Sequence, residues 1–267
     1  MNYKIGFIGA GKMATAITKG IIESEICKSS DIFMYDINDS ALEKIKNDLK
    51  VSTKKSAEEV ILSSDIVIFA VKPFVIRDVL SNLKGKFKEN SLIVSIAAGI
   101  STKTIEEYTG SLPVIRVMPN TPAFVKEGMS AVCKGTFAQE KDADTVCEIF
   151  NSLGKAIKEE EKNIDAITAV SGSGPAYFYC FINEFAKAGE KYGLNKDTSL
   201  LLAAQTALGS AKMIMETGIS PEELIRNVTT PGGCTEVGNN ILAENKIGEI
   251  IEEVVTGTKD KAHELGK

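Results

Sequence analysis

Up to about residue 160, the chain alternates short runs of apolar, β-branched residues with longer segments that carry an apolar residue every three or four positions. The short runs predict strands over 3–8, 32–35, 66–71, 92–96 and 114–118, and less distinct ones near 129–133 and 155–158. The periodic segments predict helices over 11–24, 39–49, 56–63, 75–82, 101–108 and 139–152. The strands are apolar at successive positions, which is typical of a parallel sheet covered by helices on both faces. The pattern therefore predicts an α/β domain with a doubly wound parallel sheet over residues 1–162.

The remaining residues, 163–267, carry no strand signal and predict helices alone. Segment 175–192 places Phe178, Phe181 and Phe185 on one helical face, with charged residues opposite. Segment 198–216 is apolar nearly all round and rich in Ala and Gly, so a helix there must be buried against close neighbours. Burial between two copies of the chain is at least as consistent with this pattern as burial within one copy. We therefore expect an all-α second domain that joins two chains in a homodimer.

Composition narrows the class of protein. A hydrophobic content of 43% and a charged content of 25% are those of a soluble globular protein, and the net charge of −5 argues against broad nucleic-acid binding. No apolar run approaches the ~20 residues of a membrane span, and no cationic leader precedes "YKIGFIGAG", so no membrane anchor and no secretion signal are expected. The five cysteines are scattered without C-x-x-C spacing, which predicts reduced thiols in a cytoplasmic protein and no metal site.

The only histidine, His263, is expected to be a solvated surface residue near the end of the sequence. Mechanisms that need an interior histidine therefore have no residue to use. Both a hydrolase triad and a histidine-bound zinc site are disfavoured on this ground.

A glycine-rich motif follows the first predicted strand and opens the first helix. It has the form Gly9-x-Gly11-x-x-Ala14, within "GFIGAGKMATAITKGI". In a dinucleotide-binding motif the first glycine permits a tight turn, the second lets the backbone approach a pyrophosphate, and a small third residue lets the helix pack on the strand. The helix N-terminus then offers free N–H groups to the phosphates. The motif predicts that the first domain is of the Rossmann type and binds a dinucleotide.

Asp36 ends the second predicted strand, about 25 residues beyond Gly11, where an acidic residue usually accepts a hydrogen bond from the ribose 2′-hydroxyl. A carboxylate there repels a 2′-phosphate, which favours NADH over NADPH. Nearby Lys12, Lys54 and Lys55 would offset this charge if they lie close to it. Asp36 is also a favoured residue for capping the helix that follows, and this alternative stays open.

Three further loops follow predicted strands and are expected to border the cofactor, because ligands of open α/β sheets lie beyond the carboxyl ends of the strands. They are "AVKP" (70–73), "SIAAG" (95–99) and "VMPNTPA" (117–123). In the third, two prolines stiffen the loop and present Asn120, whose amide can bind a carboxamide or a substrate.

Six motifs together resemble the pyrroline-5-carboxylate reductase family. They are "GFIGAGKMA" (6–14), "AVKP" (70–73), "SIAAG" (95–99), "RVMPNTPA" (116–123), "SGSGPAY" (171–177) and "NVTTPGGCT" (227–235), which run nearly from end to end of the chain. The first is common to Rossmann enzymes, whereas the last three in combination are specific to this family. The resemblance implies reduction of the cyclic imine 1-pyrroline-5-carboxylate to L-proline, the last step of proline synthesis. It also implies an NAD(P)-binding domain and a helical domain that interlocks two chains, sometimes within a higher homo-oligomer, with the sites completed across the dimer.

The resemblance also implies the site residues by position. The cofactor would be lined by Ile8, Gly9, Ala10, Gly11, Lys12, Met13, Asp36, Ala70, Val71, Lys72, Pro73, Ala97 and Ala98. The substrate would be held by Thr230, Gly232, Gly233, Cys234 and Thr235. One departure concerns the adenosine end, where family members commonly have Asn and this chain has Ser56 and Ala57.

The segment expected to hold the substrate can also be interpreted from its physical chemistry. The substrate carboxylate needs an anion site, and Gly232 and Gly233 can expose N–H groups at the start of a helix near residue 232. Thr235 is the candidate for hydrogen-bonding the ring nitrogen and relaying a proton. Cys234 is expected to be a small filler, because the sequence shows no neighbour that would activate it. The alternative is that Pro-Gly-Gly only starts a helix.

The sequence is also compatible with two other functions. A β-hydroxyacid dehydrogenase or imine reductase shares the expected architecture, and Lys187 and Lys191 would supply the lysine that the former needs. A nucleotide-sensing module without turnover would bind cofactor but reduce nothing.

Overall fold

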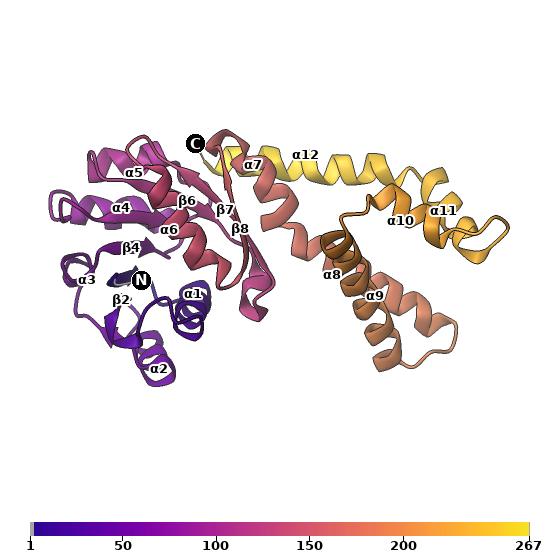
Figure 1. The fold of residues 1–267 in the computed structure, drawn as a ribbon, viewed down its shortest axis with the longest axis horizontal. Coiled ribbons are helices and arrows are strands. Elements are labelled where there is room, and N and C mark those ends of the chain that lie inside the picture. The colour runs from indigo at the N-terminus through magenta and orange to yellow at the C-terminus, as the bar shows by residue number, and fades with distance from the viewer. Residues whose placement is uncertain (1–2, 267) are drawn as a thin grey trace. The chain divides into compact units, whose positions relative to one another are not determined.

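The computed structural model describes residues 3–266, which form two compact units (Figure 1). The first unit holds the residues up to Ser173 together with those from Thr258 onward, and the second unit is Gly174–Gly257. The chain therefore passes between the units twice. The domain boundary expected between residues 162 and 163 stays a prediction.

An eight-stranded sheet is the centre of the first unit, with strand order β3-β2-β1-β4-β5-β6-β7-β8. The strands are β1 (Ile5–Ile8), β2 (Ile32–Tyr35), β3 (Ser52–Thr53), β4 (Ile66–Phe69), β5 (Leu92–Ser95), β6 (Val114–Met118), β7 (Gly128–Lys134) and β8 (Gly154–Glu159). All neighbouring pairs are parallel except β6 and β7. The predicted doubly wound sheet is confirmed, with one antiparallel step that the sequence reading did not anticipate.

The connection between β6 and β7 explains the antiparallel step. It contains only a short 3₁₀ turn, η2 (Thr121–Val125), before Gly128 begins the next strand. A parallel crossover needs a dozen or more residues, usually with a helix, so a connection this short returns the chain in the opposite direction. Between β7 and β8 the helix α6 (Glu140–Asn151) supplies such a crossover, and that pair is parallel again.

Helices cover both faces of the sheet, as Figure 1 shows. They are α1 (Lys12–Glu23), α2 (Asp39–Leu49), α3 (Ala57–Ser63), α4 (Pro73–Leu83) and α5 (Thr102–Thr109), with α6 already given. Alternate residues of β4 divide between the two cores. Ile66 and Ile68 pack with α1, α2 and α6, whereas Val67 and Phe69 pack with α3, α4 and α5. Burial on both faces is the reason that the strand reads as an uninterrupted apolar run.

A segment at the end of the first unit is tied to the sheet by a buried ion pair. It consists of η3 (Glu161–Asn163), α7 (Ile164–Ile167) and the π-helical turn η4 (Thr168–Gly172). Glu161 Oε1 accepts hydrogen bonds from Arg116 (3.0 Å) and from the Thr102 backbone N–H (2.8 Å). Its Oε2 accepts from the Thr102 hydroxyl (2.6 Å). Because Arg116 is only 6% exposed, Glu161 neutralises a charge that is buried in the sheet.

The second unit contains helices alone. They are α8 (Gly174–Lys191), α9 (Lys196–Thr217), α10 (Pro221–Val228), α11 (Cys234–Glu244) and the first part of α12 (Ile247–Leu265). The predicted helices over 175–192 and 198–216 are confirmed as α8 and α9. None of the helices in residues 3–266 has both the length and the apolar character that a membrane crossing requires.

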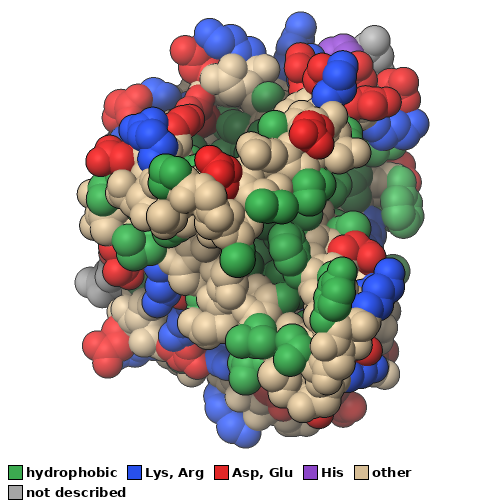
Figure 2. All heavy atoms as spheres, turned by 90° about the vertical axis from the view of Figure 1, so that its right-hand side faces the viewer, with side chains coloured by type: hydrophobic (Ala, Val, Ile, Leu, Met, Phe, Trp, Pro, Cys, Tyr) green, Lys and Arg blue, Asp and Glu red, His purple; other side chains and the backbone are tan. Residues whose placement is uncertain are grey.

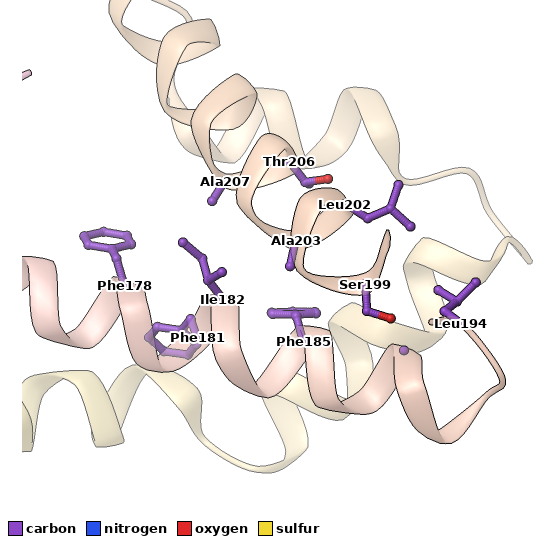
Figure 3. Close-up of a pocket in the computed structure, with 11 residues that line it drawn as sticks. Phe178, Phe181, Ile182, Phe185, Leu194, Ser199, Leu202, Ala203, Thr206 and Ala207 are labelled. Carbon is purple, nitrogen blue, oxygen red and sulfur yellow. The ribbon is translucent and has the colours of Figure 1, made fainter. Parts of the chain in front are cut away.

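The helices of the second unit leave much apolar surface uncovered. Figure 3 shows Phe178, Phe181 and Phe185 of α8 along a pocket of about 330 Å³ that α9 borders with Ala203 and other residues. Phe178 is 64% exposed and Phe185 is 68% exposed. Figure 2, viewed from the side on which Figure 1 labels α10 and α11, shows hydrophobic side chains gathered across the face. A single chain therefore leaves these apolar residues of the second unit uncovered. The apolar pattern of 198–216 predicts that the helix there is buried, so another surface is needed to cover α9.

Replacing Glu161 with alanine is expected to lower the free energy of unfolding by about 3 kcal/mol, because it leaves the buried Arg116 without its partner. Unfolding by heat and by urea measures this change in free energy. The matched control is Glu160→Ala, since Glu160 pairs with the solvent-exposed Lys162 and should leave the melting midpoint unchanged. Equal midpoints for the two variants would contradict the role of Glu161.

Candidate functional site

The loop after β1 comes into backbone contact with the loop after β4. Gly9 has a φ of +103°, and a Cβ atom added to it would lie 2.6 Å from the carbonyl oxygen of Ala70. No side chain fits at that distance, and the positive φ disfavours any residue but glycine. β1 and β4 are neighbours in the sheet, but the chain leaves them toward opposite faces. This is the switch point at which α/β proteins of this kind bind nucleotides.

Asp36 lies directly after β2 and binds the glycine loop. Its Oδ2 accepts a hydrogen bond from the Ala10 N–H (2.7 Å), and its Oδ1 accepts from the Asn38 N–H (2.9 Å). The cap of α2 is Asn38, whose side chain accepts from the Ala41 N–H. The capping alternative raised for Asp36 is therefore wrong, and its carboxylate keeps lone pairs that can accept from ribose hydroxyls.

A cavity of about 480 Å³ opens beside this loop and has the size of a small-ligand site. Of the residues expected at the cofactor, Ile8, Gly9, Asp36 and Val71 line it. Residues that the sequence reading did not assign to the cofactor complete the wall: Tyr35, Ile37, Ser56, Ala57, Glu58, Val75, Asp78, Val79, Asn82, Leu83 and Lys86. The lining residues on α4 are Val75, Asp78, Val79, Asn82 and Leu83. They recur at helical spacing after "AVKP", and this spacing is the sequence signal that could have identified them.

The cavity wall is acidic. Asp36, Glu58 and Asp78 line it with a single cation, Lys86, whose Nζ is 2.7 Å from Glu58 Oε2. Lys12, Lys54 and Lys55, which would offset the charge of Asp36 if they lay close to it, do not line the cavity. The Nζ of Lys54 lies over the Phe33 ring, 4.6 Å from its centroid. The charged side chains that line the cavity are therefore predominantly acidic.

The remaining cofactor candidates lie at the same edge of the sheet, in the loops that follow the parallel strands. Ala70, Val71 and Lys72 lie between β4 and α4, and Pro73 is the first residue of α4. Ala97 and Ala98 follow β5, where the Ala97 N–H donates to the Ser95 hydroxyl (3.3 Å). Lys12 and Met13 begin α1, whose N-cap Gly11 provides no side chain to its free N–H groups.

The last turn of α12 lies against the loop after β5. A Cβ added to Gly99, which has a φ of +74°, would be 2.9 Å from the carbonyl oxygen of Leu265. His263 Nδ1 lies 3.1 Å from Asp165 Oδ2. The histidine is exposed, as expected, but it has a carboxylate partner that its position in the sequence did not indicate.

Asn120 uses its side-chain amide within the protein. Its Nδ2 donates to the carbonyl oxygen of Ser171 (3.2 Å) and to the Ser171 hydroxyl (3.3 Å), and its Oδ1 accepts from the Met129 N–H (2.9 Å). The amide thus joins the end of β6 to β7 and to η4. Its expected role as a cofactor ligand stays a prediction.

The Pro-Gly-Gly segment lies between α10 and α11, and Gly233 is the N-cap of α11. Both glycine N–H groups, which were expected to be able to face a ligand, have partners within the protein in this structure. The Gly232 N–H donates to Glu236 Oε2 (2.8 Å), and the Gly233 N–H donates to the Thr230 carbonyl oxygen (2.8 Å). Glu236, four residues along the helix, thus places a carboxylate at the N-terminal end of α11, where the helix dipole favours an anion.

The other residues expected to bind substrate are accessible. Thr230, Cys234 and Thr235 are all exposed, and Thr235 is in the first turn of α11. Burial raises the pKa of the thiols of Cys27 and Cys133 to about 11, and both are buried. Within the part of the chain that the structure describes, no group of three or more His, Cys, Asp or Glu side chains is placed to hold a metal ion.

Comparison with known proteins identifies the family. A family model described as pyrroline-5-carboxylate reductase dimerisation matches residues 161–265, and a model described as NADP oxidoreductase, coenzyme F420-dependent, matches residues 4–99. A pyrroline-5-carboxylate reductase from Arabidopsis thaliana is 38% identical over 266 residues, which cover 100% of this chain and 96% of that protein.

Two solved structures agree with this chain in fold over their full length. One is a pyrroline-5-carboxylate reductase from Coxiella burnetii, with a TM-score of 0.95 and 33% identity over 100% of both chains. Another is the Plasmodium falciparum pyrroline carboxylate reductase with NADP bound, with a TM-score of 0.88 and 34% identity over 100% of this chain and 99% of that one. The chain belongs to the pyrroline-5-carboxylate reductase family.

Proposed function

We propose that this protein reduces 1-pyrroline-5-carboxylate to L-proline with NAD(P)H, with Thr235 and its neighbours as the substrate site. The observation that supports the cofactor half of the reaction is the glycine loop at the switch point, beside a cavity of about 480 Å³. The full-length identity to pyrroline-5-carboxylate reductases supports the substrate half.

The cofactor site is formed by the loops after β1, β2, β4 and β5. The uncapped start of α1 receives the pyrophosphate, since its N–H groups have no side-chain partner. Asp36 accepts from the ribose hydroxyls at the adenosine end. Bound NAD(P)H supplies the hydride, and the protein's own residues orient the reactants and stabilise charge.

The substrate carboxylate binds at the start of α11. It takes the place of Glu236 at the Gly232 N–H, because both are carboxylates that satisfy the same donor and the same helix dipole. Arg116, one arginine that would otherwise compete for this role, is engaged by Glu161. The backbone segment thus offers an anion site that does not use Arg116.

Thr235 hydrogen-bonds the ring nitrogen of the imine. Hydride addition to the C=N carbon leaves an amine nitrogen that must hold a proton, and a hydroxyl at this nitrogen can relay it. An imine that is protonated is already electrophilic, so the protein's task is mainly to position the reactants. No histidine is needed for this chemistry.

The second unit makes the protein a homodimer through α8 and α9. Its support is the exposed apolar surface of both helices, including Phe178 and Phe185, together with the matching dimerisation region over residues 161–265. A contiguous apolar surface of this kind on a soluble chain marks an association site.

Purified protein should oxidise NADH when 1-pyrroline-5-carboxylate is added, with proline as the product. The kcat/KM with NADH should exceed that with NADPH by about tenfold or more, because the acidic wall around Asp36 repels a 2′-phosphate. Absorbance at 340 nm with each cofactor separately measures both results. Bound cofactor without turnover would leave only a nucleotide-binding module, and a higher kcat/KM with NADPH would remove the role given to Asp36.

Thr235→Ala is expected to lower kcat by about 100-fold, because it removes the hydroxyl at the ring nitrogen. The dissociation constant for NADH should stay the same, since Thr235 is not part of the cofactor site. Thr235→Ser retains the hydroxyl and is the matched control, with activity close to that of the wild type. Unchanged turnover in Thr235→Ala would exclude Thr235 from the mechanism.

Phe181→Arg is expected to convert the dimer into monomers at micromolar concentration, because it places a charge in the apolar pocket between α8 and α9. Light scattering coupled to size-exclusion chromatography measures the mass. Lys187→Ala changes the polar face of the same helix and should leave the mass unchanged. A dimeric Phe181→Arg protein would place the interface elsewhere.

A further inference from the structure

The end of β2 holds two successive residues of the glycine loop. The Gly9 N–H donates to the carbonyl oxygen of Tyr35 (2.8 Å), and the Ala10 N–H donates to Asp36 Oδ2 (2.7 Å). The first of these bonds is made by backbone alone and is independent of the side chain at residue 35. The second depends on one carboxylate, whose other oxygen accepts from the Asn38 N–H (2.9 Å).

These bonds decide which N–H groups of the loop remain for a phosphate. With Gly9 and Ala10 engaged, the donors left for the cofactor lie at the start of α1. That helix has no side-chain cap and no acidic residue in its first turn, and a Cβ added to Gly11 would meet nothing within 4 Å. The open helix start is therefore presented by a loop whose neighbouring residue, Ala10, is fixed by Asp36.

We propose that Asp36 is a positioning residue for the pyrophosphate of the cofactor, in addition to its contact with the ribose. It fixes Ala10 and so orients the first N–H groups of α1. This inference rests on the proposed function and deepens it, because it explains how the phosphate site is held in place. It also implies that exchanging Asp36 to admit a 2′-phosphate loosens the pyrophosphate site that both cofactors share.

The chemistry of the carboxylate explains why a near-isosteric amide does not replace it. Both oxygens of Asp36 accept from backbone N–H groups, one from Ala10 and the other from Asn38. Asparagine has only one acceptor oxygen, so Asp36→Asn turns an N–H group toward one of these backbone donors. One backbone bond is lost whichever way the amide is oriented. The loop is loosened although the size of the side chain is unchanged.

The test distinguishes the effect of Asp36 on the glycine loop from its contact with the ribose. It does so with a ligand that lacks the ribose hydroxyls. Calorimetric titrations compare ADP with 2′,3′-dideoxyadenosine 5′-diphosphate, which has the phosphates but no hydroxyl for Asp36 to bind. Asp36→Asn is expected to weaken both nucleotides, the dideoxy form by about tenfold. Equal affinity of wild type and Asp36→Asn for the dideoxy nucleotide would overturn the proposal and leave Asp36 with the ribose alone.

Two controls separate positioning from a general loss of structure. Asp39→Asn makes the same change of acid to amide at the exposed start of α2, outside the cavity wall, and should change neither affinity by more than about twofold. For Asp36→Asn, the KM for the imine at saturating NADH should match that of the wild type, and the melting midpoint should fall by no more than the loss of one backbone hydrogen bond explains. Parallel changes in nucleotide affinity, melting midpoint and imine KM would assign a structural role and overturn the proposal. Asp36→Ser, whose single hydroxyl cannot reach both backbone donors, provides a second variant with the same expectation.

Steady-state kinetics complete the test. They distinguish a failure of this proposal from a failure of the proposed function. The KM for NADH should rise in Asp36→Asn, because NADH carries the pyrophosphate that the loosened loop binds. An unchanged KM for NADH would overturn the positioning role. A wild-type protein that binds ADP but does not reduce the imine would overturn the proposed function, whereas the dideoxy titration would still decide the role of Asp36.

Discussion

The backbone contact between the loops after β1 and β4 is the constraint on which the cofactor site depends. Gly9 has a positive φ and no room for a side chain, because an added Cβ would lie 2.6 Å from the Ala70 carbonyl oxygen. This contact exists because β1 and β4 are neighbours in a parallel sheet, so their carboxyl ends meet at one edge. The two cores on either face hold the strands in that order. The site is thus a product of the sheet order as much as of the glycine motif.

Charge is arranged differently at the two proposed binding sites. Acidic side chains line the cavity beside the glycine loop, and the cation that lines it is engaged by Glu58. At the start of α11, the favourable charge comes from backbone N–H groups, and a side-chain carboxylate from Glu236 already occupies one of them. An acidic protein can in this way bind anions at helix ends while keeping its side-chain charge negative elsewhere.

Much of this structure could be predicted from sequence, because its strands and helices follow their own periodicity. The apolar run at Ile66–Phe69 and the capped helix at Asp39 have local causes, and the structure has both within a residue or two of the prediction. β3 escaped prediction because a strand of only two residues, Ser52–Thr53, has no pattern to detect. The side-chain contacts of Asp36, Asn120 and Glu236 depend on residues far apart or on a particular rotamer. Sequence motifs could name Asp36 and Asn120, though not Glu236, and they could not show that the polar groups of these residues are already engaged by the protein itself.

The uncovered apolar faces of α8 and α9 bear on how the protein behaves on dilution. Phenylalanine and leucine side chains that face water in one chain contribute to folding only when another surface covers them, as in the proposed dimer. Association of this kind adds to stability in proportion to the logarithm of the protein concentration. The helical unit should therefore be least stable when the protein is scarce. Newly made chains would pass through that regime before they reach a partner.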